Sequence, residues 1–327
     1  MTSVSVVICA HTEERWDATL AAVASVRAQS LPAAEIILVV DHNPALYARL
    51  AAALPDVLVT QNQQERGLSG GRNTGIALAT GEIVAFLDDD AVAEPQWLEF
   101  FAETYADPAV AGVGGLTRPN WQTRRPSWFP DEFGWVVGCY YRGMPTSRTR
   151  VRNLHGGNAS FRREVFDVVG GFRTGIGRSA SKRPLGCEET ELCIRLSQRR
   201  PGSVLIFDDR AVIWHLVPAT RCRFSYFRAR CFAEGVSKAV VAAMVGRSDG
   251  LSTERSYITS TLPRGIAGGL ADTGRGHPAG LGRAAAILAG LAAAAAGYLS
   301  ASLRRRRWQD TVGAALATRG LARDKAP

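Results

Sequence analysis

The chain has 327 residues, of which 46% are hydrophobic and 21% are charged, so it is long enough for one large or two small globular domains. Its first nine residues lack the basic and long apolar segments of a secretory signal peptide and are typical of a β-strand. Its six cysteines form no Cys-X-X-Cys pair, which argues against a disulfide framework or a zinc knuckle and favours a reducing cytoplasm.

The net charge of +9 is unevenly distributed along the chain. Residues 221–327 carry a net charge of +11, whereas residues 1–220 carry −2. A basic segment of this kind can meet nucleic acid or an anionic membrane. Because an apolar run lies inside it and no nucleic-acid-binding motif is visible, we expect a membrane surface, and no nucleic acid, as a partner.

The N-terminal part alternates apolar strand patterns with helical patterns. We expect strands at residues 4–8, 35–40, 57–60 and 83–87, and helices at residues 16–28, 46–54 and 71–79. Continuous apolar strands that alternate with helices indicate an α/β fold with a mostly parallel, Rossmann-like sheet flanked by helices. Ligands of such sheets bind at the carboxyl ends of the strands.

The second part begins with an aromatic-rich, irregular segment, residues 116–155, which we expect to lie over a cleft. A helix at 188–199 and strands at 204–207 and 211–214 complete the predicted domain of residues 1–220. Beyond it, residues 224–246 are typical of an amphipathic helix and residues 247–283 of a linker, so that 221–283 forms a helix-and-linker segment.

Residues 284–303 carry no charge and are followed directly by four arginines, where the basic tail of residues 304–327 begins. Twenty helical residues can just span a bilayer. A single crossing from a cytoplasmic domain, however, would put the four arginines outside, against the positive-inside tendency. We favour an interfacial or re-entrant helix; a transmembrane helix, or an Ala-rich helix packed on the domain or on a second subunit, is the alternative.

Three adjacent carboxylates, Asp88, Asp89 and Asp90, follow a predicted strand directly. Such carboxylates repel one another unless a cation lies among them, and their oxygens suit Mg²⁺ or Mn²⁺, which also bind substrate phosphates. An acidic loop or a helix N-cap is the alternative interpretation of the same pattern. The sequence therefore indicates a divalent-metal site at the end of this strand.

Two further features point to a nucleotide. Residues 67–75 form a glycine-rich segment that includes Arg72, which could grip a phosphate near a helix N-terminus. Asp41 ends another predicted strand and could accept a hydrogen bond from a base or a ribose, unless it is only a turn residue.

Several motifs in order resemble family 2 glycosyltransferases with the GT-A fold. They are Ser5-Val6-Val7-Ile8-Cys9-Ala10-His11, Val39-Val40-Asp41-His42-Asn43, Gly70-Gly71-Arg72-Asn73-Thr74-Gly75, Ala79-Thr80-Gly81-Glu82 continuing to Asp88-Asp89-Asp90, Gly157-Asn158-Ala159-Ser160-Phe161, and Gly186-Cys187-Glu188-Glu189-Thr190. The resemblance covers residues 3–220, and Glu189 stands where the family usually has aspartate. Two tail motifs, residues 262–265 and 296–299, also resemble actinobacterial glycosyltransferases that act on lipid-linked sugars.

The resemblance implies a nucleotide-binding half, residues 1–115, and an acceptor half, residues 116–220. It implies a nucleotide-sugar site formed by Ala10, His11, Glu13, Asp41, Gly70, Arg72, Asn73, Asp88 and Asp89. It places Gly157, Asn158 and Trp135 on the acceptor side, and Asp88, Asp90 and His215 around a divalent metal, Mn²⁺ or Mg²⁺. Inverting enzymes of this family need a carboxylate base opposite the leaving diphosphate, for which we expect Glu189, with Glu188 second.

We therefore expect sugar transfer from a UDP or GDP donor to a hydroxyl of a lipid-linked or cell-envelope glycan, at the cytoplasmic face of the plasma membrane. A polyprenyl-phosphate sugar synthase, in which a phosphate is the acceptor, needs no base and is an alternative. A non-catalytic scaffold on the same fold is another alternative.

Overall fold

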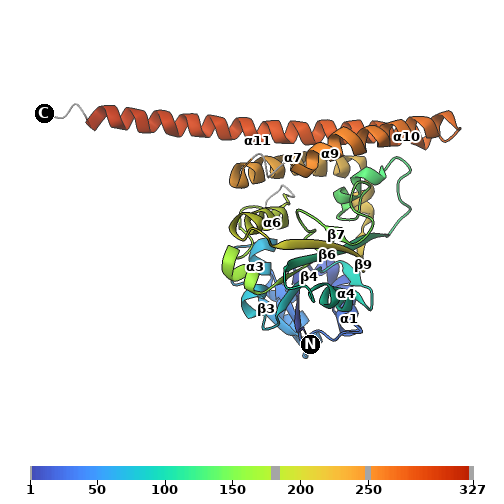
Figure 1. Cartoon of the computed structure of the whole chain (residues 1–327), viewed down its shortest axis with the longest axis vertical. Coiled ribbons are helices and arrows are strands. Elements are labelled where there is room, and N and C mark those ends of the chain that lie inside the picture. The colour runs from blue at the N-terminus through green and yellow to red at the C-terminus, as the bar shows by residue number, and fades with distance from the viewer. Residues whose placement is uncertain (1, 178–184, 247–251, 324–327) are drawn as a thin grey trace.

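The computed structural model describes residues 2–177, 185–246 and 252–323. Residues 247–251 of the predicted linker and residues 324–327 of the predicted basic tail lie outside the described residues. Figure 1 shows an α/β domain at the N-terminal end, with a layer of helices from the C-terminal third of the chain above it.

The N-terminal half alternates strands and helices, as predicted. The strands are β1 (Val4–Ala10), β2 (Glu35–Val40), β3 (Leu58–Gln61), β4 (Ile83–Asp88) and β5 (Ala91–Ala93). The helices are α1 (Trp16–Arg27), α2 (Pro44–Ala53), α3 (Leu68–Leu78) and α4 (Trp97–Thr104), and a short 3-10 helix, η1 (Glu13–Arg15), precedes α1. Apolar runs of β-branched residues form the buried strands, and Asn43 caps α2 by accepting a hydrogen bond from the Leu46 N–H.

The middle of the chain adds four strands and shorter helices. They are β6 (Val110–Trp121), the 3-10 helix η2 (Asp131–Val137), β7 (Thr149–Arg150), β8 (Asn158–Arg162), α5 (Glu164–Val169), α6 (Glu188–Arg199), β9 (Val204–Val217) and the 3-10 helix η3 (Ala219–Cys222). The two strands predicted at 204–207 and 211–214 are one strand, β9, with a register shift after Asp208. The polar residues at 208–210 thus mark a β-bulge rather than a break.

The strands form one sheet in the order β3-β2-β1-β4-β8-β6-β9-β5, with β7 paired to β9. Strands β3, β2, β1 and β4 run parallel, as predicted, whereas β8 is antiparallel to both of its neighbours, so the sheet as a whole is mixed. The carboxyl ends of β1, β2 and β4 therefore meet at one edge, where the polar residues of the predicted site follow the strands.

Two apolar cores cover the two faces of the sheet, and a third lies between the domain and the C-terminal helices. The third core contains Phe129, Phe133 and Phe227 together with Leu262 and Ile287. The aromatic segment predicted to lie over a cleft thus contributes much of its apolar surface to this third core, and Trp121, Trp128 and Trp135 pack against it.

The C-terminal third is helical. It consists of α7 (Phe224–Val245), α9 (Ser252–Ser256), a π-helical turn η4 (Tyr257–Thr261), α10 (Leu262–Gly274) and α11 (Ala279–Arg323). The linker predicted for 247–283 is wrong for residues 252–274, because its glycines serve helix packing: Gly265 approaches Ile287 and Gly269 approaches Gly280, both of α11. A high glycine content looked like a flexible linker, but the small side chains let α10 lie directly against α11.

The predicted apolar helix lies within α11. Its stretch Ala279–Arg304 is long and apolar enough to cross a membrane by length and composition, and 28% of its most apolar window is buried. Figure 1 shows α11 lying along α7 and α10, across the end of the molecule opposite the N-terminus.

Candidate active site

A large cavity of about 1480 Å³ runs from the carboxyl ends of the parallel strands to the C-terminal helices. At the strand end it is lined by Ala10, His11, Asp41, Asp88 and Arg66. At the other end it is lined by residues of α7, η4 and α11. The cavity therefore joins the predicted nucleotide site to the helical layer.

Asp41 follows β2 and lies in a closely organised turn. Its carboxylate accepts hydrogen bonds from Asn62 Nδ2 at 2.7 Å and from the Gly67 N–H at 3.0 Å, and it contacts His42 Nδ1 at 2.9 Å. Burial favours the neutral acid, but the hydrogen bonds from Asn62 and His42 outweigh it and hold the pKa of Asp41 below its ordinary value. Asp41 is thus an ionised acceptor at the wall of the cavity.

Asp88, Asp90 and His215 bring one ligand atom each to within 4.8 Å of one another. His215 lies on β9 directly opposite Ala91 of β5, and this pairing places its imidazole beside Asp90, with Nε2 3.3 Å from Oδ1. Asp90 is buried and also faces Arg15 at 3.0 Å and Arg221 at 3.5 Å. Burial disfavours the charge, but His215 and the two arginines hold the pKa of Asp90 well below its ordinary value.

These three residues fit a divalent cation. Two carboxylates and an imidazole are donors that Mn²⁺ accepts. Asp88 retains access to the cavity, and Gly157 leaves room for it, since a Cβ there would lie 2.2 Å from Asp88 Oδ2. The group can therefore hold a metal at the point where the strand ends meet the cavity.

The two glutamates of the predicted base motif begin α6. Cys187 precedes them with a φ of 71°, which turns the chain into the helix. Glu188 is buried and accepts a hydrogen bond from Arg72 Nη1 at 3.0 Å, while its Oε2 has no hydrogen-bond partner among the residues that the structure describes. Glu189 lines the cavity, and burial together with the neighbouring Glu188 raises its pKa to about 8.

Comparison with known proteins identifies the family of the chain. The model of glycosyl transferase family 2 matches residues 5–170 of the chain. The chain belongs to glycosyltransferase family 2. It is 38% identical over 242 residues to a glucosyl-dolichyl phosphate glucuronosyltransferase of Haloferax volcanii. The match covers 73% of this chain and 77% of the relative.

Two solved structures share the fold of this glycosyltransferase. One is the mannosyltransferase PcManGT from Pyrobaculum calidifontis in complex with GDP-Man and Mn²⁺, with a TM-score of 0.55 and 23% identity over 97% of this chain and 81% of that one. The other is GalNAc-T7 with UDP, GalNAc and Mn²⁺, with a TM-score of 0.51 and 18% identity over 80% of this chain and 56% of that one. The predicted GT-A-like fold class is confirmed.

Arg72 lines the cavity of this glycosyltransferase, but its charge is already paired with carboxylates. We expect it to grip the diphosphate; the residue is 3% exposed and lies between Glu188 and Asp88, 3.6 Å from the latter. Its guanidinium is therefore engaged in joining the base motif to the metal-site carboxylate. Asp89 is similarly engaged, because it is buried and binds Arg15 at 2.5 Å.

Four of the predicted donor or acceptor residues lie outside the lining of the cavity. Asn73 exchanges two hydrogen bonds with the backbone of Phe172, and Asn158 accepts from Trp97 Nε1 at 2.7 Å inside the sheet. Glu13 binds Arg49 at the surface, and Gly70 lies against the Glu65 carbonyl. We no longer assign these residues to the donor or the acceptor, since each has a structural partner instead.

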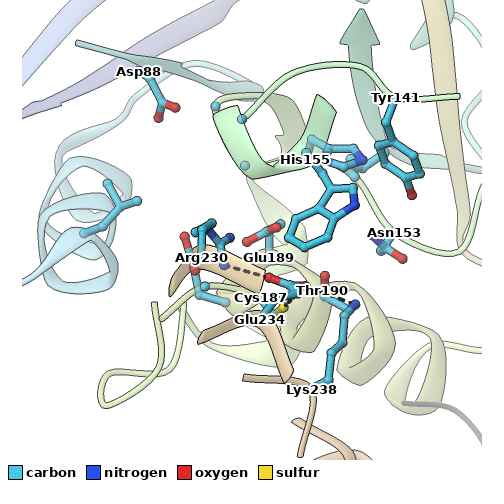
Figure 2. Close-up of a pocket in the computed structure, with 18 of the residues that line it drawn as sticks. Asp88, Tyr141, Asn153, His155, Cys187, Glu189, Thr190, Arg230, Glu234 and Lys238 are labelled. Atoms are coloured by element: carbon cyan, nitrogen blue, oxygen red, sulfur yellow. Dashed lines mark hydrogen bonds and ion pairs between the residues drawn. The ribbon is translucent and has the colours of Figure 1, made fainter. Parts of the chain in front are cut away.

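The cavity is also lined by residues that sequence reasoning missed. Arg230, Glu234 and Lys238 of α7 line it, and Figure 2 shows Glu189 beside Arg230 and Glu234. Glu234 accepts from Arg230 at 3.0 Å and from Cys187 Sγ at 3.2 Å. The spacing i, i+4, i+8 of charged residues was visible in the sequence, but nothing there indicated that this face meets the base motif.

The predicted Trp135 does line the cavity on this side. Its Nε1 donates a hydrogen bond to Tyr257 Oη at 3.1 Å, and its ring lies under the guanidinium of Arg230 at 5.8 Å. Trp135 thus joins the aromatic segment to the helical layer at the edge of the site.

Proposed function

We propose that this glycosyltransferase moves a hexosyl or uronosyl group from a UDP or GDP donor to a hydroxyl of a lipid-linked or cell-envelope glycan, with inversion at the anomeric carbon. The observation that carries the proposal is the presence of Glu189 in the same cavity as Asp88 and Asp90, which form the candidate metal group together with His215. Among the described residues, no side chain hydrogen-bonds to Glu189, so its carboxylate is available to a substrate.

The nucleotide diphosphate would lie along the carboxyl ends of β1, β2 and β4. Asp41 would accept from the base or the ribose. Arg66, which is exposed at the cavity wall, and Arg15 and Arg72, which also line the cavity, are the cations that we assign to the phosphate side. A divalent cation held by Asp88, Asp90 and His215 would neutralise the charge of the leaving diphosphate.

Glu189 would act as the general base. The acceptor oxygen forms its bond to the anomeric carbon while the bond from that carbon to the diphosphate oxygen breaks, and the electron pair leaves with the diphosphate. The hydroxyl proton goes to the Glu189 carboxylate, and a pKa near neutrality suits that step. Arg72 and Glu188 would hold the base motif in position.

The relative from Haloferax volcanii, named for glucuronosyl transfer to a glucosyl-dolichyl phosphate, supports a lipid-linked acceptor. The apolar stretch Ala279–Arg304 and the basic tail support work at a membrane, for which we propose the cytoplasmic face of the plasma membrane.

The test is transfer with a panel of UDP and GDP sugars to glucosyl-dolichyl phosphate in the presence of Mn²⁺. Glu189→Gln should lower kcat by about 10²-fold or more while nucleotide binding is unchanged. Full activity in Glu189→Gln would favour a phosphate acceptor, which is already ionised and needs no base. Hydrogen-1 NMR of the product, read for the anomeric coupling, tests inversion.

A further inference from the structure

One face of α11 is exposed, apolar and without a partner in the described chain. Leu281, Leu288, Leu299 and Leu303 are 57%, 54%, 59% and 57% exposed. At 100° per residue these four positions lie within roughly 60° of one another around the helix. The positions between them on this face are exposed alanines at 285, 292, 295 and 296. Exposed leucines in such a row mark a contact surface rather than a solvated one.

The opposite face of α11 is fixed to the rest of the molecule along most of the apolar stretch. Gly235 of α7 lies against the Ala294 carbonyl, and Gly297 lies against the Phe232 carbonyl of α7. Nearer the start of α11, Gly290 meets Phe133 and Phe227. A helix that crossed a bilayer would have to take these neighbours, and the polar cavity beneath them, into the hydrocarbon. The packed arrangement in Figure 1 instead suits a helix lying in the membrane plane.

The charges around this face match an anionic lipid surface. No charged residue lies between Ala284 and Leu303, and four arginines begin at residue 304. Arg264 and Arg275 of the neighbouring helix and turn are also exposed, and Arg275 pairs with Asp272 at 3.5 Å. An apolar strip bordered by cations is the pattern of an interfacial helix on anionic lipid.

The cavity opens at the edge of the same face. Ala295 and Leu299, both exposed, also line the cavity, together with Leu291, Ala294 and Tyr298 of α11. Tyr257, Ile258 and Leu262 line it from the facing segment. The α11 end of the cavity is therefore apolar, whereas Arg230, Glu234 and Lys238 line another part of it, with Glu189 beside Arg230 and Glu234. We call this α11 end, formed by residues 257–262 and 290–299, the apolar arm.

We propose that the exposed face of α11 rests on a bilayer and that the apolar arm takes up the lipid chain of the acceptor directly from that bilayer, past Ala295 and Leu299. An acceptor with an apolar chain and a polar head fits the cavity, because the chain can lie in the apolar arm while the sugar reaches Glu189. This inference rests on the proposed lipid-linked acceptor and adds where its lipid part binds and how it enters.

The membrane face is tested by flotation of the full-length protein with vesicles of phosphatidylcholine alone or with phosphatidylglycerol. Leu281→Glu with Leu288→Glu, which lie outside the cavity lining, should lower the bound fraction at least about tenfold. The matched control is Leu78→Glu, an exposed leucine on α3, which should bind as the parent does. Equal vesicle binding by the parent, the double variant and Leu78→Glu would overturn the proposal. So would a dimeric parent that the two substitutions convert to a monomer that still binds vesicles, because the leucine face would then be a dimer interface.

The apolar arm is tested with a benzophenone-bearing polyprenyl phosphate in the same vesicles. We expect photolabelling within residues 257–262 or 290–299. Ala295→Trp should reduce it about tenfold, whereas Ala292→Trp, on the same exposed face but outside the cavity lining, should leave it unchanged. Equal labelling of both variants, or labelling confined to other segments, would overturn the proposal.

Nucleotide titration of the same variants separates this proposal from the proposed function. The substituted positions lie away from the strand ends, so UDP or GDP should bind all variants as it binds the parent. A parent that takes the lipid probe but binds no nucleotide would count against the proposed function and leave the lipid site standing. A parent that binds nucleotide but not the lipid probe would count against the lipid site and leave the proposed function standing.

Discussion

Nη1 of Arg72 lies 3.0 Å from Oε1 of Glu188 in the interior of the protein. The same guanidinium lies 3.6 Å from Asp88, so one buried arginine joins the first glutamate of the base motif to a carboxylate of the candidate metal site. The two halves of the site, Asp88 and Glu188, are a hundred residues apart in sequence and are thereby held in one geometry.

The Arg72–Glu188 pair should be costly to break from one side. Arg72→Ala leaves the Glu188 carboxylate buried without its cation, and we expect the free energy of unfolding to fall by about 3 kcal/mol or more. Urea denaturation measures this loss. The double variant Arg72→Ala with Glu188→Gln should recover a part of it, because the remaining amide carries no charge. If the loss in the free energy of unfolding of the double variant equals the sum of the losses of the two single variants, the residues do not interact.

The candidate metal site can be tested by measuring Mn²⁺ binding directly. Asp90→Asn should abolish binding of Mn²⁺ in the presence of UDP or GDP, measured by the loss of the free-ion signal in electron paramagnetic resonance. Asp89→Asn is the matched control, because Asp89 is paired with Arg15 and lies outside the Asp88, Asp90 and His215 group. Asp89→Asn should keep Mn²⁺ binding, and equal loss in both variants would contradict the assignment.

The raised pKa of Glu189 predicts the pH dependence of the reaction. Only the ionised carboxylate can accept a proton, so kcat/KM should rise about tenfold per pH unit below a pH of about 8 and level off above it. The pH profile of Glu189→Gln should lack this limb. A parent profile that is flat from neutral pH upwards would assign the base elsewhere.

The same group affects stability in the opposite direction. Between the ordinary pKa of 4.5 and about 8 the folded protein keeps the Glu189 proton that the unfolded chain has released. The folded state therefore binds more protons in this window, and the free energy of unfolding falls as the pH rises through it. Glu189→Gln should be more stable than the parent above a pH of about 8, and denaturation at two pH values measures the difference.

Some parts of the fold and of the candidate site can be predicted from the sequence, and others cannot. The apolar runs at β1, β2 and β4 predict the sheet, and the residues after them, Asp41 and Asp88, lie at the cavity as expected. The partners of Arg72 could not be predicted, because a motif shows which residue is present and not which buried carboxylate faces it. Asn73 and Asn158 also belong to sequence motifs, but their side chains hydrogen-bond to the backbone, Asn73 to Phe172 and Asn158 to Ala211 of the sheet. The motifs alone do not show this structural role.

The C-terminal helices show a second limit. Glycines at 265 and 269 suggested a linker when only α10 was considered, and their meaning depends on α11, which packs against them. The row Arg230, Glu234 and Lys238 is regular in sequence, but its place beside the base motif follows from the packing of α7 on α6. Contacts between distant segments decide both cases.

One such contact makes a further prediction. Ser237 Oγ accepts a hydrogen bond from the Gly186 N–H at 3.0 Å, which ties α7 to the turn before Glu188 and Glu189. Ser237→Ala should lower kcat about tenfold with the KM for the donor unchanged, because the base is displaced while the nucleotide site is intact. Ser225→Ala, at an exposed position on the same helix, is the control. A rise in KM alone, or no effect, would mean that the turn is held without Ser237.

The most direct measurement is isothermal titration of UDP, GDP, CDP and dTDP into the full-length protein with Mn²⁺, with Mg²⁺ and with a chelator. We expect UDP or GDP to bind selectively and chelation to abolish the binding, since Asp88, Asp90 and His215 would hold the cation beside the diphosphate. Binding of no nucleotide by folded protein, or equal binding with and without the chelator, would contradict it.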